Sequence, residues 1–414
     1  MDPYKPLKVL MLASSYPRSK EDSAGIFLRC LAENLTKRGI QVHVLAPSDK
    51  KCGTSIEDQV VVHRFQYFPV LFQQLAYGSG ILPNLKRNPW LWIQVPFFLL
   101  SMTSFLLRVI RKERPDLIHA HWILPQGLAA VLAKFFFKMP IISTAHGSDA
   151  FSLRGTILKW LKRFVLIKSD AWTANTHATS EALGLDSSLP KPYIMPMGVD
   201  VDRFCSSERT SLRRELPEKD LLVLFVGRLV ENKGGHDLLQ AFSLLPPELR
   251  ARTSLWVVGD GQDRSMLQRY AHTLVIDHKI RFWGFIDNRR LPDFYAAADL
   301  FVAPSFAAAT GASEGQGIVL LEAFAARLCV VTTRVGGISE VVKDGSTGVL
   351  VEPHNPQQLA TAIEKLLLNE RLRRELAKNA FAIVKKYYDW EKIAKDFENL
   401  YQSVLEQRRG GVVY

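Results

Sequence analysis

The sequence predicts an α/β protein with two Rossmann-like, doubly wound parallel-sheet domains that face each other across a cleft. The chain has 414 residues, which is more than one ordinary hydrophobic core holds. Short apolar runs alternate with helical stretches in the first half, and the second half repeats the scheme. Strands that alternate with helices indicate βαβ units and therefore a parallel sheet.

Each element follows from this alternation. In the first half, buried strands are predicted over 8–15, 41–47, 116–121 and 140–147, separated by helices such as 25–39 and 127–138. In the second half, strands are predicted over 221–227, 254–261, 280–285, 300–305, 329–336 and 347–353, with helices over 237–245, 264–274, 291–298, 318–327 and 356–369. A charged helical pattern then continues over 371–407.

The join between the domains is predicted in the stretch KPYIMPMGVDVDRF, residues 191–204. Prolines and a glycine in a short apolar stretch are typical of a linker. We therefore expect a first domain over residues 1–196 and a second over residues 197–388.

The positive charge of the chain lies almost entirely in its first half. The net charge is +12, and residues 1–191 hold 24 Lys and Arg against 13 Asp and Glu. A basic half suggests an anionic partner such as a membrane surface, a nucleic acid or a phosphorylated substrate, although excess lysine also simply keeps a protein soluble. No nucleic-acid-binding module is recognisable, so we do not expect nucleic acid as the partner.

Cysteine usage and the first residues indicate a cytoplasmic protein. Four cysteines are scattered without paired spacing, which argues against a disulfide framework and a zinc site and fits a reducing compartment. The start MDPYKPLKVL has no apolar core with a cleavage signal, so no signal peptide is predicted.

One uncharged segment, Pro89–Leu107, leaves three interpretations open. A buried helix with a basic end is the plainest. A helix that lies partly in a membrane interface, anchored by Trp90, Trp92 and Phe97, is the second. A transmembrane span is the third, because the segment is about long enough to cross a bilayer.

The stretch SEGQGIVLLEAF places two carboxylates around a helix start. A loop follows the strand that ends at Ser305, and a helix is predicted to begin near Ile318. Glycines let the backbone approach a ligand closely, and the first N–H groups of a helix can hold a phosphate. Glu314 could orient hydroxyl groups ahead of the helix, and Glu322 could bind a ribose diol. Either glutamate alone would also simply suit the helix dipole.

Cations and histidines follow other predicted strands. Arg228 and Lys233 flank the loop after residues 221–227 and suit a diphosphate, although surface solvation is the alternative for each. His121 and His146 each end a strand at the same edge of the first sheet, and Asp149 follows closely. Gly25 lies in the loop after the first strand and could contact substrate or only form a turn.

Taken together, these motifs resemble the retaining family 4 glycosyltransferases of GT-B fold. The ordered set GRLVENKG, VVGDG, GF, ADLFVAPS, EGQGIVLLE and VGGISEVVKDGSTGVLVEP is the most specific part. The first half is similar more loosely, through AGIFLRCLAENLTKRGIQVHVLAP, HAHW and HGSD. Among family members, the chain resembles those that act on cell-surface polysaccharides.

The resemblance implies roles for individual residues. Glu322 would bind the donor ribose, Glu314 the transferred sugar, and Arg228 with Lys233 the diphosphate. His146 would sit by the reacting carbon, with His121 and Asp149 on the acceptor side; the catalytic set is His146, Arg228, Lys233 and Glu314. The implied donor-binding set is Gly25, Arg228, Lys233, Gly259, Glu314, Gly315, Gln316, Gly317, Ile318, Val319 and Glu322.

Further implications concern metals, the C-terminus and one departure from the family pattern. The family needs no metal or other cofactor, which agrees with discounting the Asp-x-Asp of Asp200 and Asp202 because it lies in the predicted linker. A C-terminal helix over 389–414 would cross back onto the first domain. Gln316 stands where the family often has Phe, next to the sugar, and leaves the identity of the donor sugar open.

The expected function is the metal-independent, retaining transfer of a sugar, most simply from a UDP-sugar, to a glycan or lipid-linked acceptor. The basic first domain fits an acceptor on a lipid phosphate at the inner face of the cell membrane, with an anionic membrane surface as a further partner. A nucleotide-sugar epimerase of the same fold and a non-enzymatic nucleotide-sugar or membrane-binding protein are the alternatives.

Overall fold

The computed structural model describes residues 6–19, 22–49, 52–78, 80–153, 155–184, 189–206, 211–217, 220–308, 311 and 313–409. The chain divides into two compact units. Unit 1 comprises Met1–Pro196 and Glu391–Tyr414, and unit 2 comprises Met197–Trp390. Residues 410–414, the end of the expected C-terminal helix, lie outside the described residues.

Unit 1 is built on an eight-stranded sheet in the order β3-β4-β2-β1-β5-β6-β7-β8. Neighbouring strands are parallel except β3 and β4, which form an antiparallel pair at one edge. The strands are β1 Lys8–Leu12, β2 Gln41–Pro47, β3 Gly53–Glu57, β4 Val60–Phe65, β5 Leu117–His121, β6 Ile141–Ala145, β7 Ala171–Ala174 and β8 Tyr193–Ile194. The central strands β5, β6 and β7 are buried throughout, as expected where helices cover both faces of a parallel sheet.

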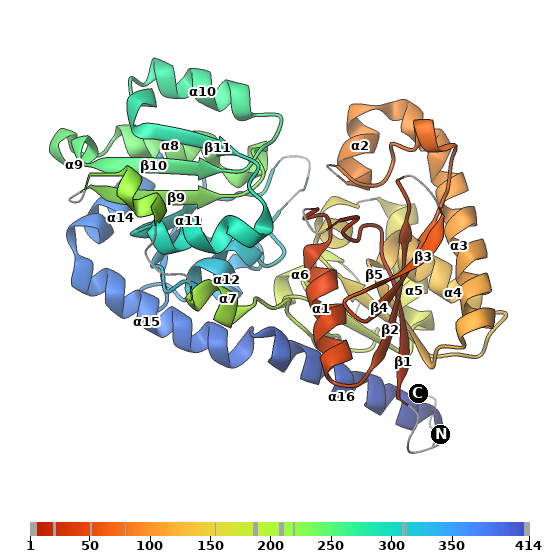
Figure 1. The fold of residues 1–414 in the computed structure, drawn as a ribbon. Coiled ribbons are helices and arrows are strands. Elements are labelled where there is room, and N and C mark those ends of the chain that lie inside the picture. Colours follow the sequence, from red (N-terminus) through yellow and green to blue (C-terminus); the bar gives the residue numbers. More distant parts are fainter. Residues whose placement is uncertain are drawn as a thin grey trace. The chain divides into compact units, whose positions relative to one another are not determined.

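Helices surround this sheet, and the last helix of the chain is one of them (Figure 1). The Tyr401 hydroxyl lies 2.7 Å from Nδ1 of His119 on β5, and Arg408 pairs with Asp170 at 2.9 Å. These contacts fix the C-terminal helix to unit 1. The helices are α1 Ile26–Lys37, α2 Ile81–Arg87, α3 Gln94–Glu113, α4 Leu128–Lys134, α5 Thr156–Lys168, α6 His177–Ala182 and α16 Trp390–Arg409.

Unit 2 has a six-stranded parallel sheet in the order β11-β10-β9-β12-β13-β14. The strands are β9 Leu221–Val226, β10 Thr253–Val258, β11 Ile280–Gly284, β12 Leu300–Ala303, β13 Val330–Thr333 and β14 Val349–Val351. The helices are α7 Val201–Cys205, α8 Gly235–Ser243, α9 Pro247–Ala251, α10 Arg264–Thr273, α11 Leu291–Ala297, α12 Ile318–Ala325, α13 Ile338–Val341, α14 Pro356–Leu368 and α15 Glu370–Tyr387. Two clusters of buried apolar side chains form its core.

The predicted fold class is confirmed, with differences in individual elements. All ten predicted strands are present, but β3, β4, β7 and β8 were not predicted. β7 and β8 are short, and β3 is exposed along most of its length. The linker prediction over 191–204 was wrong in part, since the stretch contains β8 and α7. The C-terminal helical pattern divides into α15 and α16 at Tyr388–Asp389.

The apolar segment predicted over Pro89–Leu107 forms a short 3₁₀ turn, Pro89–Ile93, followed by α3. Phe98, Met102 and Leu106 recur every fourth residue and face the core of unit 1. Within the described residues, Pro89–Glu113 is the one helical segment that is long and apolar enough to cross a membrane. In its most apolar 18-residue stretch, 33% is buried. The segment is therefore a core helix along one face, with an exposed apolar start.

Candidate functional site

An ion pair joins two of the loops that the sequence singled out in unit 2. Lys233 ends a 3₁₀ turn, Glu231–Lys233, after β9, and Glu314 lies in the loop after β12. Because β9 and β12 are neighbours in the parallel sheet, their following loops meet at one edge. The Lys233 ammonium contacts Glu314 Oε1, and the two side chains are only 21% and 12% exposed.

Helix α12 starts directly after this ion pair. Gly317 caps the helix in the left-handed conformation, with φ of 79°. Residues with a side chain rarely adopt this backbone conformation, and a Cβ would also lie 2.9 Å from Cδ1 of Leu320, so glycine is favoured here. The loop that carries Glu314 is thus held to a tight turn that aims the first N–H groups of α12 at the same edge of the sheet.

A cavity of about 350 Å³ opens beside the loop after β9. Arg228 and Lys233 both line it, together with the acidic side chains of Glu231, Asp237 and Asp263. The two cations predicted to bind a diphosphate therefore border one hollow of unit 2. Glu314 and Glu322 are not among its lining residues.

Gly259 has a structural explanation of its own. Its φ is 132°, and a Cβ would lie 1.9 Å from the carbonyl oxygen of Gly227. Its N–H donates to the carbonyl of Gly284 at 2.8 Å. Close approach of the loops after β9 and β10 is enough to require glycine here, whether or not a donor binds beside it.

The Gln316 side chain has a backbone partner within unit 2 that the sequence did not indicate. The Gln316 amide is buried, accepts a hydrogen bond from Met197 N at 2.8 Å and donates one to Met197 O at 2.8 Å. Both polar groups of the side chain are thus used on the backbone at the start of unit 2. Gln316 therefore fastens the loop after β12 to that backbone, and its place beside a donor sugar stays a prediction.

Glu322 lies in the second turn of α12, where it accepts a hydrogen bond from the Tyr295 hydroxyl at 2.7 Å. Burial raises the pKa of the Glu322 carboxyl to about 7, against the stabilising effects of the Tyr295 hydrogen bond and of Arg203. A carboxyl that is partly protonated near neutral pH can both donate and accept, which suits a diol.

In unit 1 the two predicted histidines meet. His121 ends β5 and His146 follows the neighbouring β6. Nδ1 of His121 lies 3.0 Å from Nε2 of His146, and Phe27 and Trp122 pack against the His146 ring with centroids 5.1 and 5.0 Å away. Burial lowers the pKa of His146 to about 3, so its imidazole is neutral at pH 7. In a neutral imidazole one nitrogen donates a hydrogen bond and the other accepts one.

Asp149 holds the loop that carries His146. Its carboxylate accepts from His146 N at 3.0 Å and from Ile123 N at 2.9 Å, and its side chain is 1% exposed. His121 is fully buried as well, and its Nε2 has no hydrogen-bond partner among the described residues. This arrangement favours a positioning role for Asp149 and His121, behind His146, over direct contact with an acceptor.

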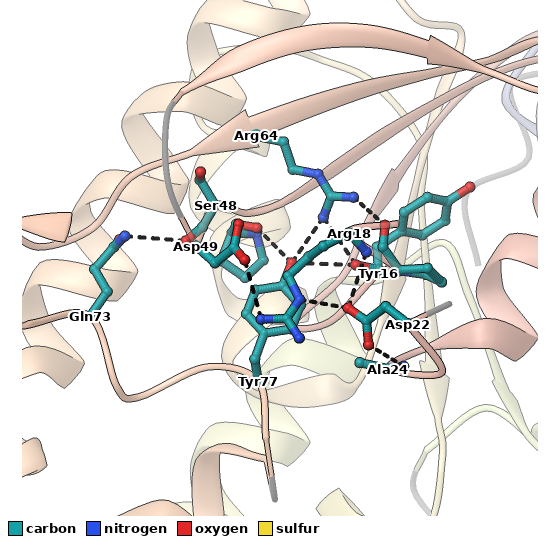
Figure 2. A network of polar contacts seen from close by, with 11 residues as sticks. Tyr16, Arg18, Asp22, Ala24, Ser48, Asp49, Arg64, Gln73 and Tyr77 are labelled. Atoms are coloured by element: carbon teal, nitrogen blue, oxygen red, sulfur yellow. Dashed lines mark hydrogen bonds and ion pairs between the residues drawn. The ribbon is translucent and has the colours of Figure 1, made fainter. Parts of the chain in front are cut away.

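Gly25 caps α1 with φ of 74°, and a Cβ there would lie 2.4 Å from the Ser15 carbonyl oxygen. The loop before it is held by a network of polar contacts, shown in Figure 2. Arg18 pairs with Asp22 at 2.5 Å and with Asp49 at 3.3 Å, and its guanidinium lies 4.4 Å from the centre of the Tyr77 ring.

Arg64 completes this network from β4. It donates to the Tyr16 carbonyl at 3.0 Å, to the Tyr77 hydroxyl at 2.9 Å and to the Pro17 carbonyl. The Tyr77 hydroxyl in turn donates to the Pro47 carbonyl at 2.6 Å. Two arginines therefore tie the loop between β1 and α1 to neighbouring parts of unit 1 through hydrogen bonds and ion pairs.

Several residues of these arrangements were not predicted. Tyr295 and Met197, the partners of Glu322 and Gln316, are distant in sequence and belong to no motif. Trp122 offered one signal, since it directly follows a strand that ends in His; its φ of 77° is unusual for a non-glycine residue, and its indole N–H donates to Ser148 at 3.1 Å.

Replacing Gln316 with leucine should destabilise unit 2. The substitution leaves the N–H and C=O of Met197 buried without partners, so the free energy of unfolding should fall by about 2 kcal/mol or more. Chemical denaturation measures this value. The matched control is Gln268→Leu on the exposed face of α10, which should stay within about 0.5 kcal/mol of the parent; equal stabilities of the two variants would contradict the role of Gln316.

The raised pKa of Glu322 predicts a pH dependence of stability. The folded chain holds this proton up to about pH 7, whereas the unfolded chain releases it near the ordinary value of 4.5. The parent should therefore lose up to about 3 kcal/mol relative to Glu322→Gln as the pH rises from 4.5 to 8. Denaturation at both pH values, with the exposed Glu375→Gln as control, checks this; a pH-independent difference would rule out the raised pKa.

Two family models together cover most of the chain. Residues 207–383 match the model described as glycosyl transferases group 1, and residues 24–203 match the model described as glycosyltransferase family 4. In solved structures, sucrose-phosphate synthase from Thermosynechococcus elongatus has a TM-score of 0.80 at 22% identity, covering 97% of this chain and 99% of that chain. Anabaena Alr3699/HepE in complex with UDP-glucose has a TM-score of 0.71 at 22% identity, covering 96% of this chain and 100% of that chain.

Two relatives illustrate the similarity in sequence. One, from Bacillus subtilis (strain 168), is TuaC, named for a glycosyltransferase role in teichuronic acid biosynthesis; it is 28% identical over 97% of this chain and 99% of its own length. Another is D-inositol 3-phosphate glycosyltransferase 2 of Catenulispora acidiphila, 32% identical over 76% of this chain and 78% of its own length. The chain belongs to the family 4, group 1 glycosyltransferases of GT-B fold.

Proposed function

We propose that the protein is a retaining glycosyltransferase that moves a sugar from a UDP-sugar to a glycan or lipid-linked acceptor in cell-surface polysaccharide biosynthesis. The observation that carries this proposal is the meeting of Lys233, Glu314 and the start of α12 at one sheet edge. The UDP-glucose complex of the Anabaena neighbour supports the choice of donor, and the name of the Bacillus relative supports the pathway class.

In this proposal unit 2 stabilises the leaving group. The bond between the anomeric carbon and the diphosphate oxygen breaks, and its electron pair leaves with the diphosphate. Arg228, Lys233 and the N–H groups at the start of α12 face the negative charge as it develops. The acceptor hydroxyl attacks on the face that the diphosphate leaves, forms the new glycosidic bond and passes its proton to the departing phosphate. No metal ion takes part in this scheme.

Unit 1 supplies the acceptor side in the same proposal. The neutral His146 ring can hydrogen-bond a sugar hydroxyl by the reacting carbon without adding a positive charge there. His121 fixes the ring through the 3.0 Å contact of their nitrogens, and Asp149 fixes the backbone. The loop at Gly25, fastened by Arg18 and Arg64, borders the strand ends of the same sheet.

We further propose that unit 1 binds an anionic membrane surface through an aromatic face. Gln94 Nε2 donates to Phe72 O at 2.7 Å, and Phe97 packs against Phe68, so the turn Val70–Phe72 and the start of α3 form one surface. Lys86 and Arg87 at the end of α2 are exposed nearby in sequence. The aromatic face consists of Leu71, Phe72, Trp90, Trp92, Ile93, Phe97 and Leu100, which are 48–87% exposed.

Aromatic side chains with neighbouring cations fit the interface of an anionic bilayer. An acceptor on a lipid phosphate would be presented at such a surface. The enzyme would then be cytoplasmic and peripheral on the inner face of the membrane.

One set of activity assays tests both the identity of the donor and the roles of Arg228 and Lys233. A panel of nucleotide sugars should show turnover with a UDP-sugar and an acceptor, with the α-linkage of the donor kept in the product. Arg228→Ala and Lys233→Ala should each lower kcat about 10²–10³-fold, because each removes charge that stabilises the leaving diphosphate.

Arg269→Ala, on the exposed surface of α10, is the control and should keep full activity. Near-parental kcat in both cation variants would remove the proposed role of Arg228 and Lys233. Conversion of the nucleotide sugar to an isomer without any acceptor would instead indicate an epimerase.

Membrane binding is tested by flotation with vesicles of anionic phospholipid. The parent should float with the vesicles and detach as salt screens the charges. Trp90→Ser combined with Trp92→Ser should reduce the bound fraction at least about 10-fold, because two interface anchors are lost. The control Phe285→Ser removes a 58% exposed aromatic side chain from unit 2 and should bind as the parent does; salt-independent or absent binding of the parent would refute the proposal.

A further inference from the structure

Three potential metal ligands meet in unit 1, on elements that carry neither His121 nor His146. His43 lies on β2, His63 on the neighbouring β4, and Glu113 at the end of α3. In the parallel register His43 is opposite Val61 and Leu45 is opposite His63. The two histidines are therefore offset by two residues and project from the same face of the sheet.

The distances among their ligand atoms are short. His43 Nδ1 lies 3.1 Å from His63 Nε2 and 4.0 Å from Glu113 Oε2, and all three ligand atoms lie within 4.8 Å of one another. A tetrahedral zinc ion with bonds of about 2.0–2.2 Å places neighbouring ligand atoms about 3.3 Å apart. The His43–His63 distance already fits, and a small rotation of the flexible Glu113 side chain would bring its oxygen into range.

We propose that His43, His63 and Glu113 bind a divalent transition-metal ion of the zinc class. Two imidazole nitrogens and one carboxylate oxygen form a ligand set that zinc takes in proteins, with the fourth position left to water. The site lies on β2, β4 and the end of α3, separate from the loops of the proposed transferase site, and a bound ion would fasten the end of α3 to these two strands.

The surroundings of the histidines suit this role. Thr54 Oγ1 lies 3.0 Å from His63 Nδ1, so His63 can donate its second N–H to Thr54 while Nε2 faces the ion. Such an outer partner orients most metal-binding histidines.

Two ammonium groups lie close to Glu113, and their positive charge repels a metal ion and limits its affinity. Lys8 Nζ donates to the Glu113 carbonyl at 2.8 Å, and Lys112 Nζ lies 3.6 Å from Glu113 Oε1. Lys112 is 75% exposed and contacts the carboxylate oxygen that faces away from His43. The remaining oxygen, Oε2, is the one that lies 4.0 Å from His43 Nδ1.

The experiment uses the full chain, stripped of metal by a chelator and titrated with zinc chloride by calorimetry. The parent should bind one zinc ion that Glu113→Gln, His43→Gln or His63→Gln weakens at least about 10-fold. His272→Gln is the control, because His272 forms an exposed pair with Asp277 on α10 and should not affect this ion. Unchanged zinc affinity in Glu113→Gln, or no zinc binding by the parent, would overturn the proposal.

A second readout keeps the test decisive if a histidine variant does not fold. Cobalt(II) added to the metal-free parent should give the intense visible absorption of a four-coordinate nitrogen and oxygen site. Zinc, and not magnesium, should raise the thermal unfolding temperature of the parent. A weak, six-coordinate cobalt spectrum together with no thermal shift would identify the cluster as a hydrogen-bonded pair of neutral histidines and overturn the proposal.

Discussion

The ion pair between Lys233 and Glu314 is the contact on which the arrangement in unit 2 depends. It exists because β9 and β12 are neighbours in a parallel sheet whose loops meet at the carboxyl ends of the strands. Both side chains are mostly buried, so each charge needs the other while no ligand is bound. In the proposed function, a diphosphate at the start of α12 would share the Lys233 ammonium with Glu314, so donor binding would be linked to the position of the loop that carries Glu314.

In unit 2 burial surrounds a pair of charged side chains, whereas in unit 1 burial keeps the imidazole rings neutral. His119 on β5 lies between the Tyr401 hydroxyl and Thr144 Oγ1, at 2.7 Å from each, and its ring packs 3.9 Å from that of His121. His121 in turn contacts His146. The last helix of the chain therefore supports the histidine pair through a hydrogen bond to His119 and the ring contact of His119 with His121, which gives a physical reason for its return to unit 1.

Helix α3 contributes to both the proposed aromatic face and the proposed metal site of unit 1. Its first turns carry part of the aromatic face, and its last residue, Glu113, belongs to the proposed metal site. Phe98, Met102 and Leu106 between them are buried in the core. An ion at the end of the helix would hold α3 firmly against the sheet while its start bears on a membrane.

The sequence by itself determined the fold class, the strands of unit 2 and the loops that carry Arg228, Lys233, Glu314 and His146. These features follow from local patterns. The alternation of apolar segments and the glycine-rich turns indicate the backbone conformation of the same residues in which the patterns occur. Short strands such as β3 and β8 were not predicted, because a strand of so few residues shows too weak a pattern of apolar side chains.

Only the tertiary structure decided how distant side chains are used. Gln316 turns toward Met197, Tyr295 bonds Glu322, and His43, His63 and Glu113 meet although 70 positions separate the first from the last. A sequence motif records neighbours along the chain. The direction of a buried side chain is set instead by whichever partner from another strand or helix satisfies its hydrogen bonds, and that partner exists only once the sheets have formed.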